Sequence, residues 1–132
     1  STVVYGARSW ESGEKDLLDH LGVRIYTMDE IRTRGYKTTL QEALSIVSVH
    51  SFYGITVDLD AFDPVNCPAG GSPEKDGLST VDFTGAIWEL STTSTLLALE
   101  VVEFAPVHDI RDQTFEFIKS VVPALLKKTG RT

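Results

Sequence analysis

The stretch ITVDLDAFDP, residues 55–64, constrains the fold of this chain more than any other. Apolar and polar residues alternate up to Leu59, which is typical of a strand, and Pro64 requires that the strand has ended. Side chains two positions apart on a strand point to the same face, so we expect Asp58 and Asp60 to lie side by side. Neighbouring carboxylates on a buried strand repel each other and lose hydration. The pair therefore predicts a bound cation, and hard divalent ions prefer such oxygen ligands.

Size and composition suit a single globular domain spanning residues 1–132. A chain of this length buries roughly two thirds of its unfolded surface, and 42% hydrophobic with 23% charged residues argues against disorder. The net charge of −7 argues against a nucleic-acid partner and suits a cationic substrate. The single cysteine, Cys67, excludes an internal disulfide, and no apolar run reaches the length of a membrane span. We expect a location in the cytoplasm or the mitochondrial matrix.

Short apolar runs alternate with amphipathic segments along the chain. This alternation predicts a mainly parallel sheet covered by helices on both faces, a three-layer α-β-α fold of the α/β class. Pairs with capping spacing, Thr27 with Glu30 and Thr39 with Glu42, mark two helix starts. Strands are expected over residues 3–6, 23–26, 53–59 and 96–103, and helices near 17–21, 27–35, 39–47, 79–90 and 112–128.

The last two predicted helices carry further signals. Ser79 and Asp82 are expected to cap the helix that ends near Leu90. The final helix should turn one apolar face inward, formed by Phe115, Ile118, Val122 and Leu125.

A long connection follows the first acidic strand end. Residues 61–79 contain three prolines and three glycines, and so long an irregular segment in a compact domain is usually functional. In parallel α/β sheets, reacting groups gather beyond the carboxyl ends of the strands. Asp58 and Asp60 stand at one such end and Glu103 at another, so we expect three carboxylates to converge on one rim.

These segments resemble motifs of the ureohydrolases, the arginase and agmatinase family. VDLDAFDP (57–64) followed by CPAGGSPEKDGLS (67–79) is similar to the family's third metal motif, roughly S-x-D-x-D-x-x-D-P and then P-G-x-G-x-P-x-x-G-G-L-[ST]. EVVEFAP (100–106) resembles a later strand that ends in V-E-x-[NA]-P, and residues 4–31 resemble the opening of the family's C-terminal half, of the agmatinase-like branch in particular. One departure is Asp76, which stands where the pattern has Gly.

The resemblance implies a role for each matching residue. Asp58 would bridge two manganese ions, Asp60 would chelate one of them, and Glu103 would receive the guanidinium of the substrate. Asp63 would be a turn residue that caps main-chain amides, and the Gly70-Gly71 loop would border the site. The implied reaction is manganese-dependent hydrolysis of a guanidino compound (agmatine, arginine or similar) to urea and an amine, with agmatine slightly favoured. Family members often form homo-oligomers, which we expect here.

The two earlier metal motifs of the family, G-G-D-H and D-A-H-x-D, have no counterpart in this chain. A pair of carboxylates holds a divalent ion poorly, so we assign no catalytic residue within the chain and expect it to be inactive alone. It starts at Ser1 without a methionine, which we interpret as the start of a fragment or processed piece of an arginase/agmatinase-like fold. The remaining half of the protein, or another subunit, would then supply the missing ligands.

Other interpretations stay open. The chain could be a non-catalytic ureohydrolase-like fragment or subunit that acts as a scaffold through an unpaired sheet edge. A mononuclear Asp-x-Asp metal domain, such as a nucleotide-dependent transferase, is less favoured because no phosphate-binding glycine loop opens a helix. Acidic strand ends also often only cap helices, and Glu103 alone would more often be an ion-pair member, with Arg8 or Arg111 as partner. Arg8 itself suits a structural or interface role.

Overall fold

The computed structural model of the chain describes residues 1–127 and is built on two pairs of parallel strands. β1 (Val3–Ala7) pairs with β2 (Arg24–Thr27), and β3 (Phe52–Asp58) pairs with β4 (Thr95–Val102). The predicted α/β class with parallel strands is confirmed. The helices are α1 (Glu14–His20), α2 (Met28–Arg34), α3 (Tyr36–Val47), α4 (Thr80–Glu89) and α5 (Gln113–Leu126), with short 3-10 turns η1 (Leu59–Ala61) and η2 (Pro106–His108).

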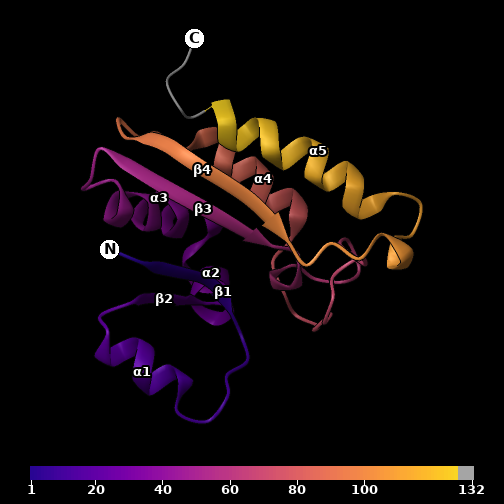
Figure 1. Cartoon of the computed structure of the whole chain (residues 1–132), viewed down its shortest axis with the longest axis horizontal. Coiled ribbons are helices and arrows are strands. Elements are labelled where there is room, and N and C mark those ends of the chain that lie inside the picture. Colours follow the sequence, from indigo (N-terminus) through magenta and orange to yellow (C-terminus); the bar gives the residue numbers. More distant parts are fainter. Residues whose placement is uncertain (128–132) are drawn as a thin grey trace.

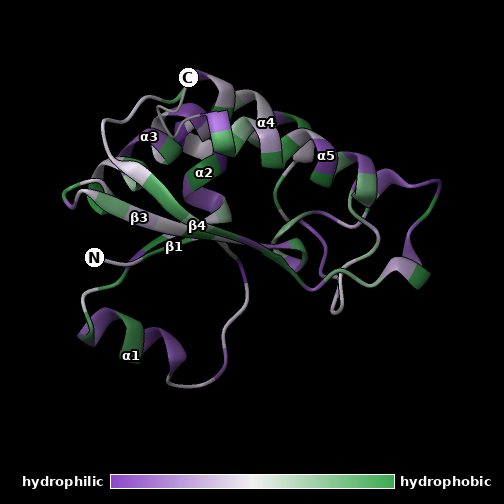
Figure 2. Cartoon of the chain, turned by 45° about the horizontal axis from the view of Figure 1, so that its top comes forward, coloured by the Kyte–Doolittle hydropathy of each residue, from purple (hydrophilic) through white to green (hydrophobic). Residues whose placement is uncertain are grey.

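Helices α2 to α5 lie on one side of the strands, and α1 lies on the other (Figures 1 and 2). The four helices contact one another in chain order. Tyr53, Val57 and Leu96 of the β3–β4 pair are buried in a core shared with these helices, whereas Leu97 points the other way and is 73% exposed. The expected three-layer arrangement is therefore only partly present within the described residues, because little covers the second face of β3 and β4.

Two of the three predicted helix caps are confirmed. Thr27 Oγ1 accepts the N–H of Glu30 at the start of α2, and Ser79 Oγ accepts the N–H of Asp82 at the start of α4. The third prediction is wrong, because α3 begins at Tyr36 and Thr39 lies inside it, fully buried.

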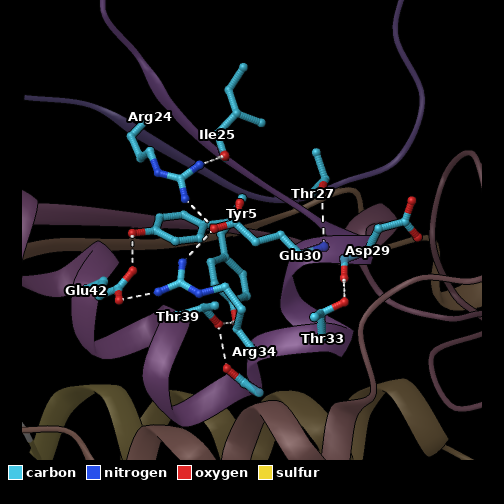
Figure 3. Close-up of polar contacts among 12 residues, drawn as sticks. Tyr5, Arg24, Ile25, Thr27, Asp29, Glu30, Thr33, Arg34, Thr39 and Glu42 are labelled. Carbon is cyan, nitrogen blue, oxygen red and sulfur yellow. Dashed lines mark hydrogen bonds and ion pairs between the residues drawn. The ribbon is translucent and has the colours of Figure 1, made fainter.

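Thr39 is buried because its hydroxyl finds hydrogen-bond partners inside the fold. It forms a hydrogen bond of 2.7 Å with the hydroxyl of Tyr5 on β1 and donates to the carbonyl of Gly35 at 2.9 Å (Figure 3). The capping spacing therefore has no role here, since Thr39 joins α3 to β1 instead.

A chain of ion pairs joins β2, α2 and α3 (Figure 3). Glu30 accepts hydrogen bonds from Arg24 and, at 2.6 Å, from Arg34, and Arg34 also binds Glu42. The Arg24 guanidinium lies 3.9 Å from the ring centre of Tyr26. The hydrogen bond from Arg24, assisted by Arg34, lowers the pKa of the Glu30 carboxyl.

The buried face of the final helix differs in part from the predicted one. Leu125 is buried as predicted, and Ile118 and Val122 are half-buried against the core, but Phe115 is 48% exposed. The other buried residues of α5 are Thr114, Phe117, Val121 and Ala124. The shift has a tertiary cause, because the Thr114 hydroxyl accepts the N–H of Ala69 at 3.0 Å and so turns inward. The predicted last residue of this helix, Lys128, lies outside the described residues. No helix within residues 1–127 has both the length and the apolar character needed to cross a membrane.

Candidate metal and substrate site

The carboxyl ends of β3 and β4 lie side by side, as predicted, and the loop after β3 begins beside them (Figure 1). The two strands are parallel, and the last residue of β3, Asp58, is paired in register with Val102 of β4. Glu103 follows directly, so the acidic residues that end the two strands are neighbours across the sheet.

Asp60 does not lie on the strand, which corrects the prediction from alternation. β3 ends at Asp58, and Asp60 is the second residue of the turn η1. The cause is Asp58 itself, because its Oδ1 accepts the N–H of Asp60 at 2.9 Å and caps the turn. The strand argument for two adjacent side chains therefore fails, and the loop that follows decides where the Asp60 carboxylate lies.

The Asp60 carboxylate contacts the Gly70-Gly71 segment of that loop. Both of its oxygens accept the N–H of Ser72, at 3.0 and 2.9 Å. A Cβ atom on Gly70 would lie only 2.3 Å from Asp60 Oδ1, so a larger residue there would displace the carboxylate. Gly70 is buried, which leaves such a side chain little room to move elsewhere.

Glu103 reaches the same segment from the other strand. A Cβ atom on Gly71 would lie 2.4 Å from Glu103 Oε2 and 3.8 Å from Asp60 Oδ2, so both carboxylates approach one point. Glu103 has a φ of +62°, a left-handed conformation that costs a non-glycine residue about 1 kcal/mol or more. Such strain is typical of residues whose side-chain direction serves a function. The predicted convergence thus exists for Asp60 and Glu103.

Asp58 takes a different position from the other two acids. It is exposed, and it lines a groove between β1 and β3 to which Asp60 and Glu103 do not contribute. Its Oδ1 is engaged by the η1 turn. Asp58 and Asp60 are therefore joined directly through the main-chain amide of Asp60.

Asp63 joins the first and last parts of the 61–79 loop. Its Oδ1 accepts the N–H of Val65 at 3.0 Å and its Oδ2 accepts the N–H of Asp76 at 2.9 Å, which confirms the expected turn role. Asp76 has a φ of +63°, which explains why the family pattern has Gly there. A Cβ on the next residue, Gly77, would lie 2.6 Å from the main chain of Phe62, so only glycine fits.

The buried end of the loop is fixed by two hydrogen bonds of the Ala69 main chain. Ala69 donates its N–H to Thr114 of α5 and accepts the N–H of Ala105, at 2.8 Å, from the segment after β4. These contacts place Gly70 and Gly71 between the two strand ends. Nearby, burial raises the pKa of the Cys67 thiol to about 11, so this cysteine is neutral at physiological pH and suits a structural role.

Two contributors to the site carried no recognisable sequence signal. Ser72 acts through its main-chain N–H, so its side-chain type gives no indication of the role. Arg8 binds main-chain carbonyls of the loop and not Glu103. A single arginine after a strand gives no indication of such contacts in the sequence. The structural role expected for Arg8 is thereby confirmed.

The described residues offer metal ligands of the right chemistry but not a complete set. Asp58 and Asp60 supply carboxylate oxygens, the donor type that manganese favours. Within residues 1–127, however, no group of three or more His, Cys, Asp or Glu side chains is placed to hold a metal ion. Further ligands from outside these residues would be required for a stable site.

Solved structures identify the class of fold. The crystal structure of arginase from Bacillus subtilis subsp. subtilis str. 168 matches with a TM-score of 0.86 and 30% identity, covering 98% of this chain and 44% of that one. A hypothetical agmatinase from Burkholderia thailandensis matches with a TM-score of 0.80 and 29% identity, covering 95% of this chain and 37% of that one. Formimidoylglutamase from Bacillus subtilis also matches, with a TM-score of 0.85 and 28% identity, over 96% of this chain and 40% of that one. The fold is arginase-like.

Sequence comparison specifies the family. The arginase family model matches residues 1–127. The arginase of Bacillus subtilis (strain 168) is 30% identical over 128 residues, which are 97% of this chain and 43% of that protein. The chain therefore belongs to the arginase family, the ureohydrolases. It spans about two fifths of the length of the relatives that it matches.

Proposed function

We propose that the complete protein hydrolyses a guanidino compound to urea and an amine, and that residues 1–132 are the C-terminal portion of its single arginase-like domain. The observation that carries this proposal is the convergence of the Asp60 and Glu103 carboxylates at Gly71. A guanidinium presents N–H groups in a planar fork that pairs well with a carboxylate. Glu103 is proposed to hold the substrate in this way, and the absence of a side chain at Gly71 leaves room for its carboxylate.

Manganese is the proposed cofactor, with Asp58 as a bridging ligand and Asp60 as a ligand of one ion. A bound pair of manganese ions would supply a water activated for attack at neutral pH. The contribution of the chain itself is to orient the carboxylates. Ser72 fixes Asp60 through its N–H, and the η1 turn fixes one oxygen of Asp58.

The remaining ligands are proposed to come from the rest of the protein, and a groove of about 450 Å³ between β1 and β3 supports this. Within the described residues, each of these strands pairs along one edge only, so main-chain groups of both strands are available beside the groove. Its walls are largely apolar, with Val3, Tyr5, Ile55 and Val57 among the lining residues. An added strand from the remainder of the protein would satisfy both edges.

The test compares the complete protein with residues 1–132 alone. Purified complete protein, supplied with manganese, should release urea from agmatine, arginine or a related guanidino compound. Residues 1–132 alone should release none, and adding the remainder as a separate chain should restore part of the activity. Absence of urea release from the complete protein with every guanidino compound tried would contradict the proposal. The comparison of agmatine with arginine decides the substrate, with agmatine slightly favoured by the opening segment.

The same groove also favours a second candidate, a non-catalytic subunit that uses its unpaired strand edges as a scaffold or interface. The sequence that precedes Ser1 in the complete protein separates the two. G-G-D-H and D-A-H-x-D motifs there would support the enzyme, and their absence would support the scaffold. In either case we expect a homo-oligomer located in the cytoplasm or the mitochondrial matrix.

A further inference from the structure

Arg8 leaves the end of β1 in a direction that the local backbone sets. The register between β1 and β2 is interrupted between Tyr5 and Ala7, and Gly6 between them has a φ of +87°. A Cβ on Gly6 would lie 2.9 Å from Leu78 Cδ1, so the strand end is pressed against the last part of the 61–79 loop. Arg8 therefore emerges directly beside that loop.

The Arg8 guanidinium donates to four main-chain carbonyls in two segments: the near arm, residues 60–61 where the 61–79 loop begins, and the far arm, residues 74–75 towards its end. In the near arm it binds the carbonyls of Asp60, at 2.7 Å, and Ala61, at 3.3 Å. In the far arm it binds the carbonyls of Glu74, at 2.7 Å, and Lys75, at 3.0 Å. A guanidinium has five N–H donors in a rigid planar fork, so it can hold both arms at once, whereas a lysine ammonium is a single point donor.

The two arms tied by Arg8 are those that carry the site. The near arm contains Asp60, and the segment just before the far arm contains Gly71 and Ser72. The Ser72 N–H contacts the Asp60 carboxylate, and Gly71 packs against both Asp60 and Glu103. The spacing between the arms thus determines whether Ser72 reaches Asp60 and whether Gly71 stays against Glu103.

We propose that Arg8 is a positioning residue for the candidate site, which holds the two arms of the 61–79 loop at the spacing that orients Asp60 and Glu103. It contacts neither the predicted metal nor the predicted substrate. Its effect passes through the main chain of both arms. The use of manganese affinity and urea release as readouts rests on the function proposed above. The contact of Arg8 with both arms does not depend on that function.

The test uses Arg8→Met and Arg8→Lys in the complete protein, with Arg32→Met as the matched control. Arg32 also binds the loop, since it donates to the carbonyl of Asp76 at 2.6 Å, but it does not reach the arm of Asp60. Three quantities are measured: hydrogen exchange of the amides of residues 59–79 resolved to single residues, manganese affinity by titration of the metal-free protein, and kcat and KM for urea release.

Arg8→Met should speed exchange at the Ser72 amide and weaken manganese binding about 10- to 100-fold, the range typical for groups that orient metal ligands. Arg32→Met should leave the Ser72 amide and manganese affinity unchanged. Arg8→Lys should keep the overall fold but restore neither the slow exchange of the Ser72 amide nor the manganese affinity. This variant decides the question if Arg8→Met does not fold. Equal exchange and equal manganese affinity in the Arg8 and Arg32 variants would overturn the proposal. If the unmodified complete protein binds no manganese, the proposed function fails, and exchange at Ser72 alone decides the role of Arg8.

Discussion

The carboxylate of Glu103 occupies the space that a side chain at Gly71 would need, with Oε2 only 2.4 Å from the ideal Cβ position. The two residues come from different parts of the chain, one just beyond β4 and the other inside the 61–79 loop. Asp60 Oδ2 lies 3.8 Å from the same position. A single missing side chain thus lets an acidic residue from each strand end approach one point, and this relationship can be tested directly.

Gly71→Ala should move Glu103 without unfolding the protein. The added methyl group conflicts with a flexible carboxylate at an exposed position, so Glu103 can rotate away and the free energy of unfolding should change by less than about 1 kcal/mol. We expect KM for the guanidino substrate to rise roughly tenfold, as for the loss of one hydrogen bond to a charged group. Gly85→Ala is the control. It has open space around its Cβ position inside α4 and should stabilise the protein by about 0.5–1 kcal/mol with unchanged kinetics.

Glu103→Gln should separate substrate binding from metal binding in the complete protein. The amide keeps the size of the side chain but loses the negative charge that pairs with a guanidinium. Manganese content measured by elemental analysis should stay unchanged, whereas the affinity for a guanidino inhibitor should fall about 10- to 100-fold. Glu100→Gln, three residues earlier on β4, where the carboxylate accepts a hydrogen bond from Thr56, should alter neither. Unchanged inhibitor affinity in Glu103→Gln would show that Glu103 is purely structural.

Asp58→Asn should remove at least one manganese ion from the complete protein, because a neutral amide is a poorer ligand for a hard cation than a carboxylate. The fold should persist, since an asparagine oxygen can still accept the N–H of Asp60 and cap η1. Metal content and urea release are measured together. Asp19→Asn, which alters only an exposed ion pair with Lys15, serves as the control. Full retention of both ions together with normal turnover in Asp58→Asn would exclude the bridging role.

Sequence reasoning located the ends of the strands well but not the geometry between them. The proximity of Asp58 and Glu103 follows from parallel pairing, in which the carboxyl ends of neighbouring strands share an edge. The position of Asp60 does not follow, because Asp58 captures its N–H and converts the expected strand into a turn. Strand periodicity predicts which face a side chain occupies, but it cannot predict that a side chain will end the strand.

Other errors arose where a polar side chain found a distant partner. Thr39 has capping spacing with Glu42, yet its hydroxyl bonds Tyr5, 34 positions earlier in the sequence. Thr114 rotates the buried face of α5 by one residue because it binds Ala69. Such contacts depend on how elements pack, so a local pattern does not contain them. The loop contacts of Arg8 and Ser72 were hidden for a related reason, since both involve main-chain groups, which are the same in every sequence.

The start of α5 offers a test of pH dependence, because the carboxylate that accepts its first N–H groups comes from Asp109 and not from the residue directly before the helix. Asp112 precedes the helix directly but makes no side-chain cap, whereas Asp109 accepts the N–H groups of Ile110, Thr114 and Phe115 at 2.9–3.0 Å. Burial works to raise the pKa of the Asp109 carboxyl, but these N–H groups outweigh it and hold the pKa below the ordinary value of 3.8. The ionised carboxylate is therefore favoured by folding.

Asp109→Asn should lower the free energy of unfolding by about 1 kcal/mol at pH 7, because the amide keeps one oxygen for the N–H groups of Ile110 and Thr114 but replaces the charged Oδ2 that accepts the N–H of Phe115 with an NH2 donor. A carboxyl with a lowered folded-state pKa stabilises the fold above its unfolded pKa, and this stabilisation is lost as the pH falls through the folded value. The difference between the parent and the variant should accordingly be constant from pH 7 to about 5 and shrink below about pH 4. Urea unfolding at several pH values measures it. Asp112→Asn should show no such difference, because the Asp112 side chain caps nothing and asparagine tolerates its φ of +58°. A difference for Asp109→Asn that stays constant down to pH 3 would show that the charge of Asp109 contributes nothing to the cap.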